Sequence, residues 1–193
     1  MKHYWPQYLL IPCTLLVLLL QPLYALFVKP SSFRWRDGCF ECVDNTPDSR
    51  RTTIWGRPGG QSWGCRWLWF NRTVSRDWGP LAVHERVHAL HGEWINGIAH
   101  AALIPLAIYL DGGWHWVWCL ALAQLAFGIA YGLHFLWEWG KRGFGPWKVE
   151  DENGKMVDGP GYEAYLRIFS ERIAYRIDDE YERGLRPDAW GAR

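Results

Sequence analysis

The chain has 193 residues, 49% of them hydrophobic, with 21 basic and 20 acidic side chains and a formal net charge of +1 at pH 7. This length suits one domain of ordinary size, and a charged fraction of 21% argues against a disordered chain. Because the charge is nearly balanced and lacks a block of lysine or arginine, we expect no nucleic-acid partner. The 15 tryptophans suggest a membrane instead, since tryptophan gathers at the boundary between lipid and water.

The first predicted element is an apolar stretch over residues 8–28, whose only strongly polar member is Gln21. This stretch is long enough to span a bilayer, so residues 1–28 are predicted to form an N-terminal transmembrane helix. A cleaved signal peptide is the alternative, because Leu23-Tyr24-Ala25 weakly resembles a processing site.

Residues 29–80 are rich in glycine, proline, tryptophan and arginine, and they are predicted to form a small antiparallel β region. Residues 53–55 and 63–70 have the composition of strands. Residues 56–62 between them contain Pro58-Gly59-Gly60, which is typical of a turn. The region also holds three cysteines that could bind a metal or form a disulfide: Cys39, Cys42 and Cys65.

Residues 81–142 are predicted to form a long helix that continues into an apolar helical hairpin. Residues 117–135 contain no Asp, Glu, Lys or Arg, and tryptophans stand at both ends of this run. Such a pattern is typical of a membrane-spanning helix with interface anchors. Residues 95–110 form a shorter apolar run. Only residues 111–113 separate residues 95–110 from Trp114, which predicts antiparallel helices joined by a tight turn. A buried hairpin in a soluble core is the alternative.

Basic residues flank these apolar segments, and they predict an orientation. Lys29 and Arg34 follow the first segment, and Lys141 and Arg142 follow the last. By the positive-inside tendency, the main body faces the cytoplasm from a bacterial inner membrane, with membrane lipid as a partner.

Residues 143–193 are predicted to form a β-hairpin and a C-terminal helix. Residues 147–149 and 155–157 flank Asn153-Gly154, which is a strong signal for a hairpin turn. Residues 162–183 then have a helical period, which predicts one continuous helix.

The sequence His84-Glu85-Arg86-Val87-His88 has the HExxH pattern, and Pro80 marks the start of its helix. Positions four apart lie on one face of a helix, so His84 and His88 can bind the same zinc ion. Glu85 then lies close enough to accept a proton from a metal-bound water. A polar helix face at the membrane boundary is the structural alternative.

A catalytic zinc ion normally has three protein ligands. His91 lies about 10 Å along the helix from His84, too far to share an ion with it. The C-terminal helix offers Glu171, whose carboxylate lies among apolar neighbours and requires a partner. An ion pair of Glu171 with Arg86 or another basic side chain is the alternative. Metal-bound imidazoles usually donate their second N–H, and the candidates for this supporting role are His91, Asp178 and Tyr175.

The two segments together resemble small bacterial and phage membrane-associated proteins of gluzincin type. Members of this family have the pattern HExxHxxQ, then an apolar stretch, then a segment like NPFEREA. The resemblance covers about residues 50–180; here His91 replaces the usual glutamine, and Ile168-Phe169-Ser170 replaces NPF. It implies that Glu85 is the catalytic base and that Zn²⁺ has three ligands: His84, His88 and Glu171.

These observations predict a membrane-anchored zinc metallopeptidase that hydrolyses peptide or protein substrates near the membrane surface. Two alternatives remain open. Glu85 and His88 also form the ExxH unit of carboxylate-bridged di-iron bundles, although no second ExxH occurs in the sequence. A catalytically silent membrane protein that mediates assembly is the other alternative.

Overall fold

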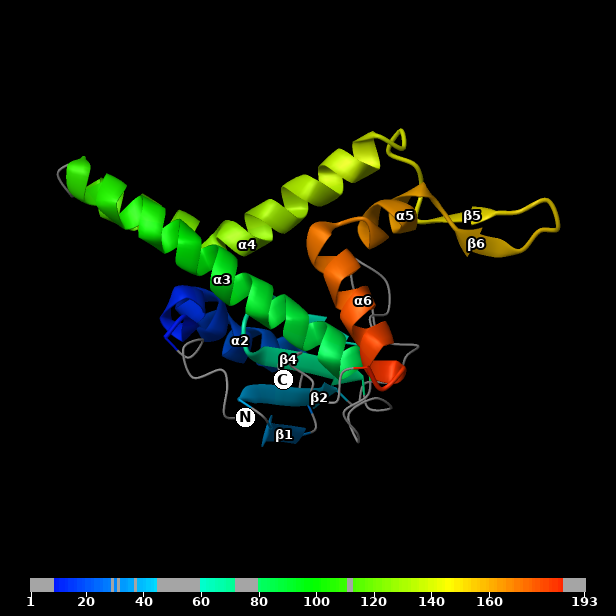
Figure 1. The fold of residues 1–193 in the computed structure, drawn as a ribbon, viewed down its shortest axis with the longest axis horizontal. Coiled ribbons are helices and arrows are strands. Elements are labelled where there is room, and N and C mark those ends of the chain that lie inside the picture. Colours follow the sequence, from blue (N-terminus) through cyan, green and yellow to red (C-terminus); the bar gives the residue numbers. More distant parts are fainter. Residues whose placement is uncertain are drawn as a thin grey trace.

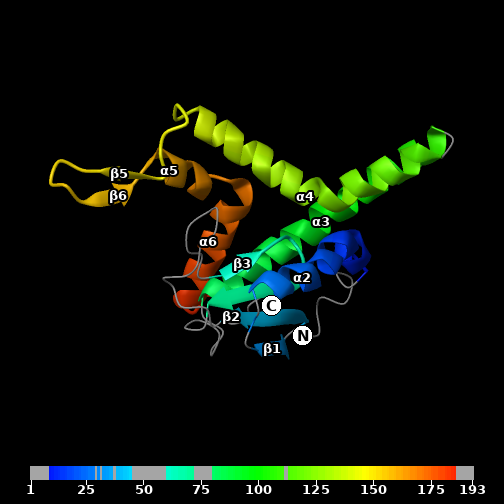
Figure 2. The same ribbon diagram turned by 180° about the vertical axis from the view of Figure 1, so that it is seen from behind.

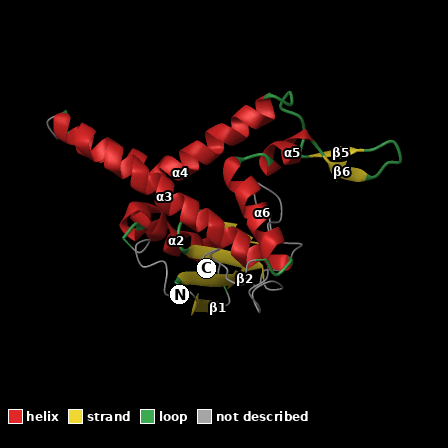
Figure 3. Cartoon of the chain, viewed as in Figure 1, coloured by secondary structure: helices red, strands yellow, loops and turns green. Residues whose placement is uncertain are grey.

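The computed structural model describes residues 9–28, 30, 32–36, 38–44, 60–71, 80–110 and 113–185. Helices make up most of this structure, together with a four-stranded sheet and a separate two-stranded hairpin (Figures 1 and 3). The predicted α+β class is therefore confirmed.

The N-terminal apolar segment forms a short 3-10 turn, η1 (Ile11–Thr14), followed by helix α2 (Leu15–Val28). The 14 residues of α2 extend about 21 Å, less than the ~30 Å hydrocarbon core of a bilayer. The 3-10 turn passes directly into α2 without a break, and Pro12 stands near the start of the turn. Crossing of the membrane by this segment stays a prediction.

The sheet contains β1 (Ser32–Arg36), β2 (Cys39–Asp44), β3 (Gly60–Ser62) and β4 (Trp67–Asn71), in the order β1-β2-β4-β3. The pairs β1–β2 and β3–β4 are antiparallel, but β2 and β4 run parallel. The prediction of an antiparallel region was therefore wrong on this pairing. Residues 60–62 were expected in a turn and instead form the edge strand β3, and the strand expected over 63–70 begins only at Trp67. The strand expected at 53–55 lies outside the described residues.

Side chains alternate along β4, so its two faces have different partners. Leu68 and Phe70 pack with Ala82 and Ala89 of helix α3 (Pro80–Tyr109) in the core. On the other face, the indole Nε1 of Trp69 donates to Gln21 Oε1 of α2 over 2.7 Å. Helices α2 and α3 therefore cover opposite faces of the sheet, as Figures 1 and 2 show from the two sides.

Helix α3 lies unusually close to the chain between β3 and β4. A Cβ atom at Gly92 would lie 1.9 Å from the backbone oxygen of Gly64, so only glycine fits there. The next residue, Glu93, forms a buried two-point ion pair with Arg66, in which Nη2 and Oε2 lie 3.0 Å apart. These contacts fix the first half of α3, which carries the HExxH residues, on the sheet.

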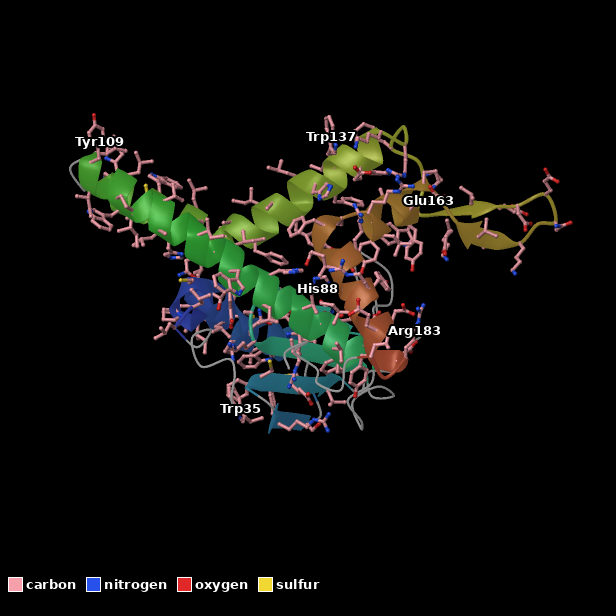
Figure 4. All side chains as sticks on the ribbon, viewed as in Figure 1. Trp35, His88, Tyr109, Trp137, Glu163 and Arg183 are labelled. Atoms are coloured by element: carbon pink, nitrogen blue, oxygen red, sulfur yellow. The ribbon has the colours of Figure 1, made fainter. Side chains whose placement is uncertain are left out.

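Helix α4 (Trp114–Gly140) follows α3. The end of α3 and the start of α4 form an arm that extends away from the sheet, with Tyr109 near its tip (Figures 1 and 4). Among the described helices, α4 alone is long and apolar enough to cross a membrane. Only 17% of its most apolar window is buried. The alternative to a membrane segment was a core helix of a soluble protein, and a core helix would be mostly buried.

Polar side chains join the helices where α4 crosses α3. Asn96 of α3 donates to the backbone oxygen of Gln124 and accepts from the backbone N–H of Phe127, each over 2.8 Å. In a regular helix these backbone groups bond to other backbone groups of the same helix. The side chain of Asn96 therefore takes the place of backbone partners within α4. Gln124 in turn accepts from the backbone N–H of Leu16 over 2.9 Å and donates to Pro12 O over 2.8 Å. The N-terminal segment is thereby attached to the arm.

The C-terminal part begins with the expected hairpin, β5 (Lys148–Glu150) and β6 (Met156–Asp158). The single helix predicted over 162–183 is instead two helices, α5 (Pro160–Leu166) and α6 (Phe169–Glu182). At the break, Ile168 has an extended backbone with ψ 137° and a fully buried side chain. The break turns α6 so that it packs along the first half of α3 (Figure 1).

Candidate metal centre

The HExxH residues occupy the first turns of α3, and all three chemically important side chains are buried. His84 and His88 lie four positions apart, and their rings meet edge to face with centroids 4.8 Å apart. Helix α6 brings Glu171 to the same place, 2% exposed. The structure thus brings together the two histidines and the glutamate that the sequence analysis selected.

The donor atoms of this group have the spacing of a metal site. His84 Nε2 lies 3.0 Å from Glu171 Oε2, and His88 Nε2 lies 3.2 Å from Glu171 Oε1. All three donor atoms lie within 4.8 Å of one another. Two ligands at 2.0–2.1 Å from a tetrahedral zinc ion lie roughly 3.3 Å apart, so little movement is needed to enclose an ion.

The electrostatics of the site keep Glu171 ionised. Burial alone would raise its pKa, but hydrogen bonds from His84, His88 and Tyr131 hold the pKa of Glu171 well below its usual range. Glu171 also lies in the first turn of α6, where the helix dipole stabilises a negative charge. Burial likewise opposes the charge on His84, yet hydrogen bonds to Asp178 and Glu171 raise the pKa of His84 to about 9.

Two of the proposed supporting residues contact His84 directly. Asp178 Oδ2 lies 3.2 Å from His84 Nδ1, the nitrogen that a metal bound at Nε2 leaves free. The ring of Tyr175 packs edge to face on His84, with centroids 4.5 Å apart. A ligand oriented in this way loses little conformational freedom when it binds an ion.

His91, the third supporting candidate, reaches His88 through a hydroxyl group. Ser170 Oγ lies 2.6 Å from His88 Nδ1 and 2.8 Å from His91 Nδ1. When His88 Nδ1 donates to Ser170, the hydroxyl can donate onward to a neutral His91. Ser170 therefore links the two imidazoles and leaves Nε2 of His88 to face Glu171.

The half-buried ring of His91 makes the stability of the chain sensitive to acid. Burial and then the charge of His88 lower the pKa of His91 from 6.5 to about 4. Between these pH values the unfolded chain binds more protons than the folded chain, so acidification favours unfolding. The shift corresponds to about 3 kcal/mol, and partial exposure of the ring reduces this to about 1–2 kcal/mol.

Replacement of His91 by glutamine is expected to remove this part of the acid sensitivity. Denaturant titrations of the metal-free chain at pH 6.5 and pH 4 measure it. Wild type should lose about 1–2 kcal/mol more free energy of unfolding than His91→Gln across this range. His115→Gln, at an exposed position near the start of α4, serves as the control. An equal loss in wild type and His91→Gln would contradict the burial of a neutral imidazole.

Glu85 lies on the side of α3 that faces the edge strand β3. A Cβ atom at Gly60 would lie 2.9 Å from Glu85 Cγ and 3.0 Å from Oε1, so the carboxylate packs directly on this glycine. The backbone N–H of Ser62 donates to the carboxylate. Burial raises the pKa of Glu85 to about 6, although the charges of His88 and His84 oppose the shift. A carboxylate with this pKa can accept a proton near neutral pH.

The sequence analysis did not select Ser170 or Tyr131. The hydroxyl of Tyr131 on α4 donates to Glu171 Oε1 over 2.5 Å. A lone hydroxyl within the apolar run was the signal for Tyr131, whereas Ser170 gave no signal beyond its place beside Glu171. Of the alternative partners for Glu171, the structure shows histidines and not Arg86, because the Glu171 oxygens face His84 and His88.

The three cysteines of the sheet do not form a second site among the described residues. Cys39 packs toward α3 in the core, and Cys42 lies on the opposite face of β2, where Trp67 Nε1 donates to its sulfur. Burial raises the pKa of both thiols, and that of Cys65, to about 12. All three are free thiols, so the disulfide that was one of the two possibilities for them is not formed.

Comparison of the chain with protein-family models, with curated proteins and with solved structures found no match. The interpretation of the site therefore depends on its own geometry.

Proposed function

We propose that this protein is a membrane-anchored zinc metallopeptidase. The observation that carries the proposal is the convergence of His84, His88 and Glu171 from two helices, with Glu85 beside them. Two imidazoles and one carboxylate are a donor set of catalytic zinc sites that leave one position open. Zinc at this position would polarise a carbonyl group and lower the pKa of bound water toward ~7.

The residues of the chain have separate tasks in this proposal. His84, His88 and Glu171 hold the ion, while Glu85 accepts the proton of the attacking water and passes it to the leaving amine. Asp178 orients His84. Burial of the four side chains limits competing contacts with bulk water, which strengthens each electrostatic interaction.

The edge strand β3 supports a peptide as the substrate. It is the outermost strand of the sheet beyond β4, and Glu85 packs against Gly60 within it. An unpaired edge can add an extended peptide as a further strand through backbone hydrogen bonds. Because this pairing uses backbone groups alone, it would place a peptide bond beside Glu85 whatever side chains the peptide has.

The exposed apolar helices support membrane attachment. Tyr109 and Trp114 at the tip of the arm are 85% and 77% exposed, and leucines of α2 are exposed as well. An exposed apolar surface of this extent is unfavourable in water. Lipid would shield it, and tryptophans at its ends suit the boundary between lipid and water. We infer attachment to a bacterial inner membrane with the body on the cytoplasmic side, where Lys141 and Arg142 follow α4.

Removal of the metal is expected to abolish peptide hydrolysis, and one equivalent of zinc should restore it. The full chain in detergent is treated with a chelator, incubated with an unfolded protein substrate, and assayed for new amino termini by mass spectrometry. Elemental analysis of the same sample gives the metal content. Two irons per chain, or cleavage that persists in the metal-free chain, would overturn the proposal.

A further inference from the structure

A second candidate site lies at the other end of α4 from the tip of the arm. It is a pocket of about 430 Å³ lined by His134 and Glu138 of α4, Arg167 of the α5–α6 break, and Arg172 of α6. None of these residues has a task in the proposed peptidase chemistry. The sequence analysis did not single out this group, because its members come from separate parts of the chain.

The pocket has an excess of positive charge. Within the described part of the chain, neither Arg167 nor Arg172 forms an ion pair, and both side chains are exposed. The one acidic residue of the lining, Glu138, is already paired with Lys141 over 2.8 Å and Arg142 over 3.0 Å. The two guanidinium groups are therefore available to an anion.

His134 adds an oriented N–H donor. Its Nδ1 accepts the backbone N–H of Phe169 over 3.1 Å, and the two rings stack with an interplanar angle of 6°. A neutral imidazole that accepts at Nδ1 carries its proton on Nε2. Glu138 Oε1 lies 4.0 Å from that nitrogen, which is beyond hydrogen-bond distance. The Nε2–H group thus stays available to a ligand in the pocket.

We propose that this pocket binds the phosphate group of an anionic lipid. Two guanidinium groups and one imidazole N–H match the acceptor oxygens of a phosphodiester. The outward face of the same turns of α4 is apolar, with Leu133 63%, Leu136 50% and Trp137 64% exposed (Figure 4). Acyl chains on that face would place a headgroup at the pocket, and basic pockets beside membrane helices are suited to such headgroups.

The test compares two pairs of arginines in the full chain in detergent. Arg167→Gln/Arg172→Gln removes the pocket charges, and Arg176→Gln/Arg183→Gln removes two charges from the same end of the chain outside the lining. Each chain is titrated by calorimetry with dihexanoylphosphatidylglycerol, dihexanoylphosphatidylcholine and inorganic phosphate. The pocket variant should bind the phosphatidylglycerol about thirtyfold more weakly than wild type, and the control less than about threefold.

Each other outcome overturns the proposal. If both variants bound the phosphatidylglycerol equally weakly, the lipid would be held by the overall positive charge of this end of the chain and not by the pocket. Inorganic phosphate bound as tightly as the phosphatidylglycerol would assign the pocket to a soluble anion. Equal binding of the phosphatidylcholine, which has the same phosphodiester but no net charge, would show that the pocket does not select an anionic lipid. Both variants should keep the zinc content of wild type, so this result and the fate of the peptidase proposal are independent.

Discussion

Replacement of Glu171 by glutamine is expected to weaken zinc binding by about a hundredfold or more. Structural zinc sites gain ~10–16 kcal/mol from typically four ligands, so one ligand accounts for about 3 kcal/mol. Glutamine keeps the shape of the side chain, but it loses the charge and directs an amide group toward His84 or His88. Competition with a chromophoric chelator measures the affinity, and circular dichroism establishes that the variant is folded.

Glu163→Gln is the matched control for this substitution. Glu163 lies on α5 with its side chain 63% exposed, so its loss should leave zinc affinity unchanged (Figure 4). Asp178→Asn should have an intermediate effect of about tenfold, because Asp178 contacts His84 and not the ion itself. Equal zinc affinity in Glu171→Gln and Glu163→Gln would exclude Glu171 from the ligand set.

Replacement of Glu85 by glutamine should separate metal binding from catalysis. The glutamine oxygen can still accept from the Ser62 N–H, so the local packing is retained. Without a carboxylate, the attacking water loses its base, and a base of this kind contributes about 10²–10⁴ in rate. Zinc content should stay at the level of wild type while the rate of peptide cleavage falls by that factor.

His84→Ala gives the complementary result, because it should lose both the metal and the cleavage. Comparison of the two variants distinguishes a missing base from a missing ion. A cleavage rate in Glu85→Gln equal to that of wild type would refute the assignment of Glu85 as the base, even if the metal centre itself were established.

Local patterns predicted the parts of this site that depend on helix geometry. Pro80 begins α3 as expected, and the spacing of His84 and His88 places both rings on one face. Glu171 was selected because a carboxylate among apolar neighbours needs a partner, and the structure places it between the two histidines. The spacing of the histidines and the surroundings of Glu171 are each visible within one helix, so each could be inferred from a local pattern.

The features that sequence reasoning missed depend on contacts between distant segments. The break at Ile168 follows from burial of its side chain, together with the capping of Phe169 by His134 of α4. The parallel pairing of β2 with β4 joins residues as far apart in the chain as Phe40 and Trp67, and no local signal records it. The same is true of Tyr131, whose partner is 40 residues away.

The separation of His84 and Glu171 along the chain, 87 residues, has a consequence for assembly. An ion held by both side chains would act as a cross-link that closes a loop containing all of α4 and the β5–β6 hairpin. Closing a flexible loop of this length costs on the order of 4 kcal/mol of chain entropy, which the metal would offset in the way a disulfide does. Docking of the last helix is then thermodynamically linked to metal uptake, and a chelator would favour its release from the rest of the fold.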